Sequence, residues 1–244
     1  MARLEYVGHS TVLVELDGTR ILTDPLVRDR VGYVLRDAPV PRLDELRGLD
    51  AILISHAHAD HLDVPSLKRL AHGGPVVAPQ GLGPLLRKAG ATAVIELTAG
   101  EHCTIGALDI EAVHAEHDGR RYPLTRPLPA LGYLLDGAPR VYFAGDTDLY
   151  AEMEALAGRV DVALLPIAGW GPRVPEGHLD PAGAARAVAL IRPSVVVPIH
   201  WGTMRRVALR SIGDTHALAF ADAVAALAPA TEVRILQPGE SMPL

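Results

Sequence analysis

The densest group of chemically active side chains in this sequence is the run HAHADH at residues 56–61. Side chains two positions apart in an extended segment project to the same side, so His56 and His58 can reach one point. A turn into a following helix can then direct Asp60 and His61 toward a second point. Imidazole and carboxylate groups are good ligands for zinc, iron or manganese. The run therefore predicts two adjacent half-sites for metal ions.

Three further segments share one pattern, an apolar stretch that ends on a metal-capable residue: LDIEAVH at His114, VYFAGD at Asp146 and VVVPIH at His200. Sites in sheets covered by helices form beyond the carboxyl ends of the strands. We therefore expect these residues to meet HAHADH at one edge. Asp146 has two oxygens and could bridge two cations, and Gly145 permits a close approach of the backbone. His117 competes with His114, which we prefer because it ends the strand directly; His117 is expected to support the site or to be exposed.

The elements that must position these residues alternate along the chain. Apolar strands are expected at 51–55, 160–166 and 194–199, and helices at 65–72, 82–89, 151–158, 181–191 and 216–227. Asp180 and Pro181 are suited to the start of one helix, as its N-cap and first turn. Residues 25–48 look irregular. This alternation predicts an α/β fold in which helices cover the sheets.

Composition narrows the class of protein. The chain has 244 residues, of which 49% are hydrophobic and 21% charged, as in soluble globular proteins. No linker divides it, so we expect a single domain over 1–244. A net charge of −6 argues against a nucleic-acid partner, and one cysteine, Cys103, excludes an intrachain disulfide. No signal peptide or transmembrane run is recognisable, so a cytoplasmic protein is expected.

The histidine run and the later His, Asp and His resemble the metallo-β-lactamase superfamily. Four further segments narrow the resemblance: VGHSTVLVELDGTRILTDP near the start, FAGDTD at 143–148, GHLDP at 177–181 and PIHWGT at 198–203. They are similar to the branch that contains ascorbate-6-phosphate lactonase-like proteins and N-acyl-phosphatidylethanolamine phospholipase D. The resemblance covers residues from about 4 to 204 and implies a four-layer αββα sandwich with the site at one edge.

The resemblance also implies a set of roles for the residues. It assigns His56, His58 and His114 to one metal, Asp60, His61 and His200 to the other, and Asp146 to both. Two divalent ions are expected, zinc first, with manganese and iron as alternatives. Such a pair lowers the pKa of a shared water, so that a bridging hydroxide can attack a small ester, lactone or phosphodiester. Asp60 is expected to share the proton of this water as well as to bind a metal.

Other residues have more than one interpretation. In related sequences a histidine at the place of His178 lies beside the substrate, where it could donate a proton or hold an oxyanion; the alternative is a histidine packed at the helix entry. His9 is expected to orient a ligand, and Asp24 either supports the metal loop or is a turn residue. Two groups are left open between the cleft and ordinary packing or surface, Trp170 with Trp201, and the arginines Arg120, Arg121, Arg126 and Arg173.

Two other functions compete with that of a small-molecule hydrolase. A metal-dependent nuclease is disfavoured by the acidic balance and by the lack of a recognisable RNA-binding domain. A non-catalytic or redox protein with a di-iron site is the alternative from another class; zinc is spectroscopically silent, so metal content and optical spectra would separate the two. The loop arginines leave open an anionic substrate. The sequence also leaves open a homo-oligomer.

Overall fold

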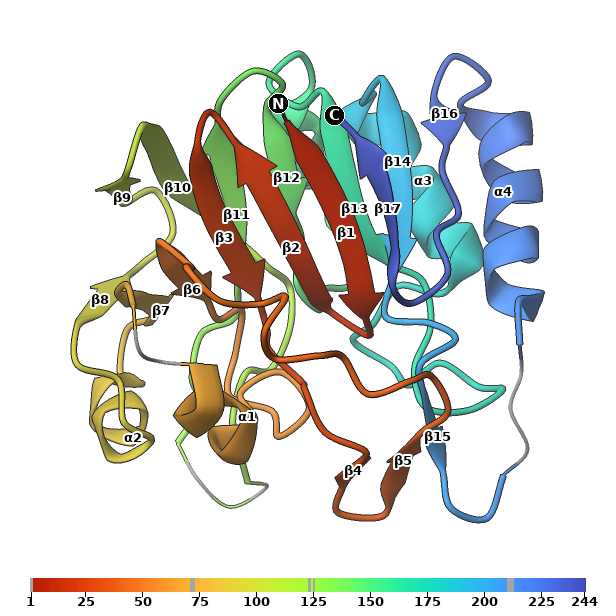
Figure 1. Ribbon diagram of the computed structural model, residues 1–244. Helices are drawn as coiled ribbons and strands as arrows, with labels where there is room; N and C mark the ends of the chain where they lie inside the picture. The colour runs from red at the N-terminus through yellow and green to blue at the C-terminus, as the bar shows by residue number, and fades with distance from the viewer. Residues whose placement is uncertain (1, 71–72, 123, 125, 210–212) are drawn as a thin grey trace.

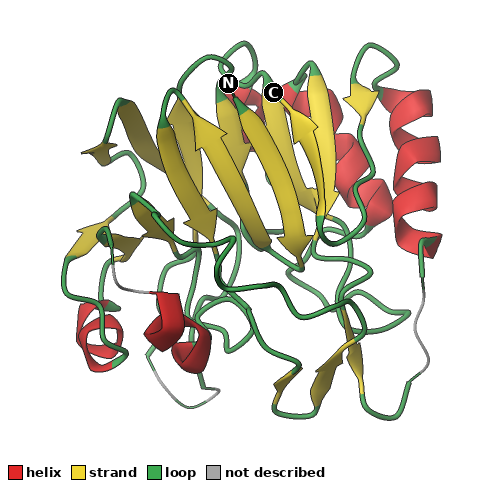
Figure 2. Cartoon of the chain, in the orientation of Figure 1, coloured by secondary structure: helices red, strands yellow, loops and turns green. Residues whose placement is uncertain are grey.

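The computed structural model describes residues 2–70, 73–122, 124, 126–209 and 213–244. Figure 1 traces the chain, and Figure 2 separates helices from strands. The longer helices are α1 (Val64–Leu70), α2 (Gly83–Lys88), α3 (Pro181–Ile191) and α4 (Thr215–Leu227), with a 3₁₀-helix, η1, at Ala151–Leu156. The strands of the first half are β1 (Arg3–Gly8), β2 (Thr11–Leu16), β3 (Thr19–Thr23), β4 (Arg30–Val31), β5 (Val34–Arg36), β6 (Ala51–Leu53), β7 (Val76–Pro79), β8 (Val94–Leu97), β9 (His102–Ile105) and β10 (Leu108–His114). Those of the second half are β11 (Leu131–Asp136), β12 (Val141–Phe143), β13 (Val162–Pro166), β14 (Val195–Ile199), β15 (Met204–Arg206), β16 (Glu232–Val233) and β17 (Glu240–Pro243).

Two seven-stranded sheets face each other and form the centre of the molecule (Figure 1). The first has the order β17-β1-β2-β3-β6-β7-β8, and the second β16-β14-β13-β12-β11-β10-β9. Helices α1 and α2 pack against the outer face of the first sheet, and α3 and α4 cover the second. This is the four-layer αββα arrangement that the resemblance implied.

The strands of the first sheet carry apolar side chains on both of their faces, and for this reason both faces of the sheet are covered. Along β1 and β2, Tyr6 and Val12 point into the core between the sheets, whereas Val7 and Leu13 belong to the cluster beneath α1 and α2. Successive side chains of a strand face opposite sides, so a strand buried on both faces reads as a nearly continuous apolar run. The segments VVV of β14 and ALL of β13 follow the same rule.

The helices agree in part with the sequence predictions. Helix α3 has the predicted bounds. The Asp180 side chain accepts a hydrogen bond from the Gly183 N–H at 2.6 Å, and Arg192, directly after the last helical residue, is the C-cap, with a left-handed φ of 55°. Helix α1 ends at Leu70, and residues 71–72 of the predicted helix lie outside the described residues. The predicted helix at 151–158 is instead a 3₁₀-helix. None of the described helices is long and apolar enough to cross a bilayer.

A small third sheet, β15-β5-β4, was not predicted from the sequence. Its strands have two or three residues each, and two of them lie in the segment 25–48, which we expected to be irregular. Strands this short carry almost no periodic pattern. The sheet lies at the end of the sandwich where the loops after β1, β3 and β14 gather (bottom of Figure 1). This third sheet therefore lies at the same end of the molecule as the histidine run.

Candidate metal centre

The HAHADH run forms a loop between β6 and α1, at the carboxyl end of a buried strand. Its backbone is fixed from outside. Ala57 donates to the Gly119 carbonyl at 3.2 Å, and Arg121 Nη1 donates to the carbonyls of Ala57 and Leu62 at 2.9 and 2.8 Å. Arg121 thus stabilises the backbone of the histidine loop. Of the four arginines left open by the sequence, this one supports the site through the backbone.

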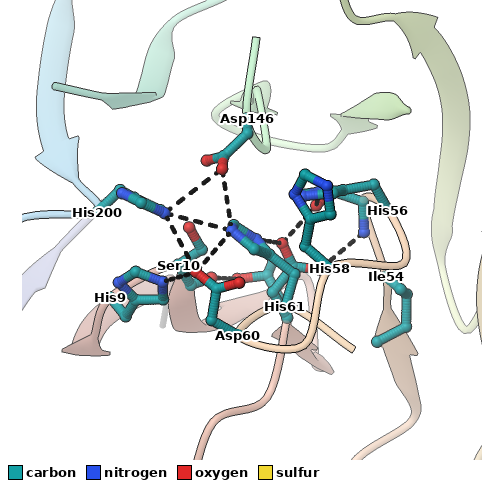
Figure 3. Close-up of polar contacts among 12 residues, drawn as sticks. His9, Ser10, Ile54, His56, His58, Asp60, His61, Asp146 and His200 are labelled. Carbon is teal, nitrogen blue, oxygen red and sulfur yellow. Dashed lines mark hydrogen bonds and ion pairs between the residues drawn. The ribbon is translucent and has the colours of Figure 1, made fainter. Parts of the chain in front are cut away.

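The side chains of this loop meet residues from the second sheet in two groups. Figure 3 labels the loop residues His56, His58, Asp60 and His61 together with Asp146 and His200. In the first group, His58 Nδ1 lies 3.3 Å from His117 Nε2, and the His56 ring makes T-shaped contacts with both of these rings. The second group contains Asp60 and the facing Nε2 atoms of His61 and His200, which lie 3.3 Å apart.

Asp146 lies between the two groups. Its Oδ2 is 3.1 Å from His61 Nε2 and 3.4 Å from His200 Nε2. It also approaches His117: one carboxylate oxygen of Asp146 and one ring nitrogen each of His117 and His178 all lie within 4.8 Å of one another. The structure therefore brings together six of the seven residues predicted as ligands: His56, His58, Asp60, His61, Asp146 and His200.

His114 is the exception, and the expectation that it joins His56 and His58 is wrong. Strand β10 still pairs with β11 at His114, opposite Leu131, so the chain has not yet turned toward the centre. The His114 side chain is 56% exposed and contacts Glu116 instead. The turn comes afterwards, where the Glu116 N–H donates to Thr147 Oγ1 at 3.0 Å, and it carries His117 to the site. His117 had been treated as the weaker choice.

Most rings of the centre are oriented by a hydrogen bond at Nδ1. The partners of Nδ1 are the Ser55 hydroxyl for His56, at 2.9 Å, and the Asp24 carboxylate for His61, at 2.7 Å. Nδ1 of His117 and of His200 lies 2.9 Å from the backbone carbonyls of Gly177 and Ala168. With Nδ1 committed to the protein, Nε2 of each ring faces the cluster, as is common where histidine binds a metal.

Two buried atoms at the centre show that its residues fit a cation. In the described part of the chain, His56 Nε2 and Asp146 Oδ1 have no hydrogen-bond partner. A buried polar atom without a partner is costly, and in native proteins it commonly marks a ligand. Burial raises the pKa of Asp146, but the charges of His200 and His61 outweigh it and hold that pKa well below its usual range. Imidazole nitrogens and ionised carboxylates are the donors that zinc takes, and a bound cation would replace the protons on these rings, so the residues present fit a pair of metal ions.

Asp24 and His9 each contact a side chain of the centre. Asp24 is fully buried, and its carboxylate accepts from the Ser55 N–H at 2.7 Å and binds His61 Nδ1. His9 Nε2 lies 2.8 Å from Asp60 Oδ2, and its carbonyl accepts from the His200 N–H. Three residues of this region, His9, Asp24 and His200, have left-handed φ values of 59°, 30° and 62°. Such backbone conformations are strained for residues other than glycine and cluster at functional sites.

A cavity of about 570 Å³ opens directly onto this centre. His58, Asp60, Asp146 and His200 line its floor, and His178 lines its side, with His178 Nε2 3.4 Å from Asp146 Oδ2. Trp170 forms part of the wall and donates from Nε1 to Asp60 Oδ2 at 3.0 Å. Trp201 is buried and stacks on Tyr6 instead. Of the remaining loop arginines, Arg173 lines the cavity, whereas Arg120 pairs with Asp118 and Arg126 is exposed.

The layered fold and this centre agree with the family comparison. The model of the beta-lactamase superfamily domain matches residues 19–201, three quarters of the chain. The chain belongs to the metallo-β-lactamase superfamily. The match contains the histidine loop, His117, Asp146 and His200, whereas His9 lies before it.

Relatives and solved structures place the chain within the superfamily. It is 34% identical to a UPF0173 metal-dependent hydrolase of Aeropyrum pernix, over 99% of this chain and 97% of that protein. It is 32% identical to N-acyl-phosphatidylethanolamine-hydrolyzing phospholipase D 1 of Caenorhabditis elegans, over 81% of this chain and 63% of that protein. The structure of Igni18, a metallo hydrolase of Ignicoccus hospitalis, superposes with a TM-score of 0.74 at 28% identity and covers 99% of this chain and 97% of its own. The chain spans 59% of the length of an uncharacterised relative from Mycobacterium tuberculosis.

Proposed function

We propose that the protein is a hydrolase that depends on two divalent metal ions and acts on a small ester, lactone or phosphodiester. One ion would be held by His56, His58 and His117, and the other by Asp60, His61 and His200, with Asp146 shared between them. The observation that carries this proposal is the pair of partnerless buried atoms, His56 Nε2 and Asp146 Oδ1, at the centre beneath a cavity of about 570 Å³. Cavities of this size are typical of small-molecule sites.

The chemistry follows from the donors around the cavity. Two divalent ions, when bound, lower the pKa of a water molecule and polarise a carbonyl or phosphoryl oxygen. Zinc is the metal that the histidine-rich donor set favours. Asp60 would accept the proton of the attacking water, and its Oδ2 is fixed for this role by His9 and Trp170. His178 lines the cavity, its Nε2 lies 3.4 Å from Asp146 Oδ2, and it is not needed as a metal ligand, so it would donate a proton to the leaving group.

The test combines metal content with hydrolysis. The purified protein is reconstituted with zinc, manganese or iron, and bound metal is measured by inductively coupled plasma mass spectrometry. We expect about two equivalents per chain, and about one after His56→Ala or His200→Ala. Each metal form is then assayed with phenyl acetate, γ-butyrolactone and bis(4-nitrophenyl) phosphate, and again after chelation with EDTA.

Hydrolysis of at least one of these substrates that is lost with EDTA and restored by metal would support the proposal. His178→Gln should retain both metals and lower kcat. A protein that binds no metal after reconstitution, or that binds two and hydrolyses none of the three bond types, would contradict it. A strong optical absorption of the iron form without hydrolysis would instead support the redox alternative.

A further inference from the structure

A row of aromatic and basic side chains leads from the metal centre to the mouth of the cavity. Trp170 donates to Asp60 at the inner end, and its indole meets Tyr33 edge-on, with ring centroids 6.1 Å apart at 80°. The guanidinium of Arg206 lies over the Tyr33 ring, 5.5 Å from its centroid. Trp170, Tyr33 and Arg206 all line the same cavity. A cation on an aromatic face is held in place without losing its charge.

The backbone holds this row together. Tyr33 lies in the turn between β4 and β5, and its carbonyl accepts from the Val207 N–H at 3.0 Å. The Arg206 N–H donates to the Trp170 carbonyl at 3.2 Å. The small sheet β15-β5-β4 is therefore the element that presents Tyr33 and Arg206 to the cavity, although it contributes no residue to the metal centre.

The charge of Arg206 is available to a ligand. Its neighbour Arg205 binds Asp37 at 2.5 Å, whereas Arg206 has no carboxylate partner in the described part of the chain. Arg173 also lines the cavity without such a partner among those residues. The wall between these cations and the centre is apolar or uncharged, formed by Trp170, Pro172, Pro175 and Leu209. The cavity thus has an acidic, metal-binding floor, an apolar wall and a basic mouth.

We propose that Arg206, seated on Tyr33, selects substrates that carry an anionic group, a carboxylate or a phosphate, at the end remote from the bond that is cleaved. The apolar wall would hold the body of such a substrate, while its ester or phosphoryl group faces the floor. Arg206 would then be a specificity residue, acting on binding and not on the chemical step. The inference rests on the proposed function for the cleaved bond, but the recognition of the anion can be measured separately.

The experiment compares substrates that differ only in the remote group. Phenyl acetate has none, 4-acetoxybenzoate has a carboxylate, and 4-acetoxyphenyl phosphate has a phosphate; each rate is divided by the rate with hydroxide alone. We expect the wild type to favour the anionic esters about tenfold through KM, as is typical for one exposed charged hydrogen bond. Arg206→Gln should remove this preference, so that the KM of each anionic ester rises to about that of phenyl acetate with the same variant. Arg69→Gln on the outer side of α1 changes the net charge equally and should keep it.

A second measurement does not depend on turnover. Binding of phenol, 4-hydroxybenzoate and 4-hydroxyphenyl phosphate to the metal-free protein is followed by the change in tryptophan fluorescence, because one of the two tryptophans, Trp170, lines the cavity. Tighter binding of the two anions in the wild type but not in Arg206→Gln supports the inference, even if no ester is cleaved and the proposed function fails. The same preference in Arg206→Gln as in the wild type, or its loss only in Arg173→Gln, would overturn the assignment to Arg206. Equal binding of all three ligands by the wild type would overturn it altogether.

Discussion

The orientation of each imidazole decides whether its lone pair can reach a cation. At His61 and His200, a carboxylate or carbonyl accepts a hydrogen bond from Nδ1–H, and Nε2 of each ring then faces Asp146. His117 has the same arrangement through the Gly177 carbonyl, whereas His114 has only the exposed contact with Glu116. The acceptor behind its ring therefore favours His117 over His114 as a metal ligand.

This difference predicts opposite effects for two substitutions three positions apart. His117→Ala removes one imidazole of the first group, so we expect it to bind about one metal equivalent and to lose most activity. His114→Ala should bind about two equivalents and retain activity, because its side chain is exposed at the end of β10. Metal analysis of both variants, with circular dichroism to verify folding, is the test. If His114→Ala lost a metal while His117→Ala kept both, our arrangement of the centre would be wrong.

At this scale the sequence predicted six of the residues that the structure brings together and preferred His114 to His117, which also lies at the centre. HAHADH follows a buried strand and offers little choice of ligand, and Asp146 and His200 each come directly at the end of an apolar segment. In VHAEHDGRR two histidines compete, and the choice depends on where β10 stops pairing. That point is set by hydrogen bonds to residues 131 and 147, distant in the sequence, which no local pattern encodes.

At the scale of elements, the close approach of two loops holds the centre together. Gly145, just before Asp146, has a φ of 63°, and a Cβ there would lie 2.5 Å from Ser55 Cβ. Ser55 precedes the histidine run and binds Asp24, so Gly145 joins the loop after β12 to the loop after β6. The expectation from sequence that Gly145 permits a close backbone approach is confirmed.

We expect Gly145→Ala to disturb both stability and metal binding. The added methyl group must displace Ser55 or Asp146, and the left-handed backbone adds strain, so the free energy of unfolding should fall by about 2–4 kcal/mol. Gly158→Ala is the matched control, because Gly158 also has a positive φ, 76°, but a Cβ there meets nothing within 4 Å. Urea unfolding and metal titration of both variants make the comparison. Equal losses in the two would show that the contact with Ser55 contributes nothing.

The elements themselves were predictable where burial was continuous. The strand of VVVPI and the helix of PAGAARAVALI agree with the sequence predictions because apolar runs, an N-cap and a proline define them. The strands β4, β5 and β15 were not predictable, since their two or three residues pair only because the chain brings positions 34–36 and 204–206 together. The contacts from Trp170 through Tyr33 to Arg206 depend on this pairing, so the sequence alone could not predict them either.

At the scale of the whole molecule, the centre is assembled from both sheets. His56, Asp60 and His61 follow β6 of the first sheet, whereas Asp146 and His200 follow β12 and β14 of the second. Packing these side chains together buries several imidazoles in one place. Burial, reinforced by neighbouring imidazolium charges, lowers the pKa of His9 to about 3 and that of His58 to about 4.

The stability of the metal-free protein should therefore depend on pH. In the unfolded chain, histidine has a pKa of about 6.5, so below that pH the unfolded state binds protons that His9 and His58 refuse in the folded state. The free energy of unfolding should fall from about pH 6.5 to about pH 4, by up to about 1.4 kcal/mol per pH unit for each of these two residues. The surrounding carboxylates raise the pKa of His61 despite its burial. Between pH 4 and pH 6.5 His61 is therefore protonated in both states and leaves the free energy of unfolding unchanged, and its stabilising contribution is lost only at higher pH.

Urea unfolding of the metal-free protein at half-unit steps of pH would measure this slope. Above pH 6.5, His9 and His58 are neutral in both states, so a slope there belongs to His61 and not to these two groups. Stability that is constant or rising between pH 6.5 and pH 4.5 would show that His9 and His58 are not buried as neutral rings.

The division of the centre between the two sheets has a consequence for the protein during its synthesis. His61 and His200 face each other across 139 positions of sequence. At about 5–20 residues per second, a ribosome would complete His200 roughly 7–28 seconds after His61. Throughout that interval the growing chain displays HAHADH without the strand that closes it. A nascent chain could therefore hold a metal only loosely at its first histidines, and full loading has to wait until the last ligand has left the ribosome and the second sheet has closed over the first.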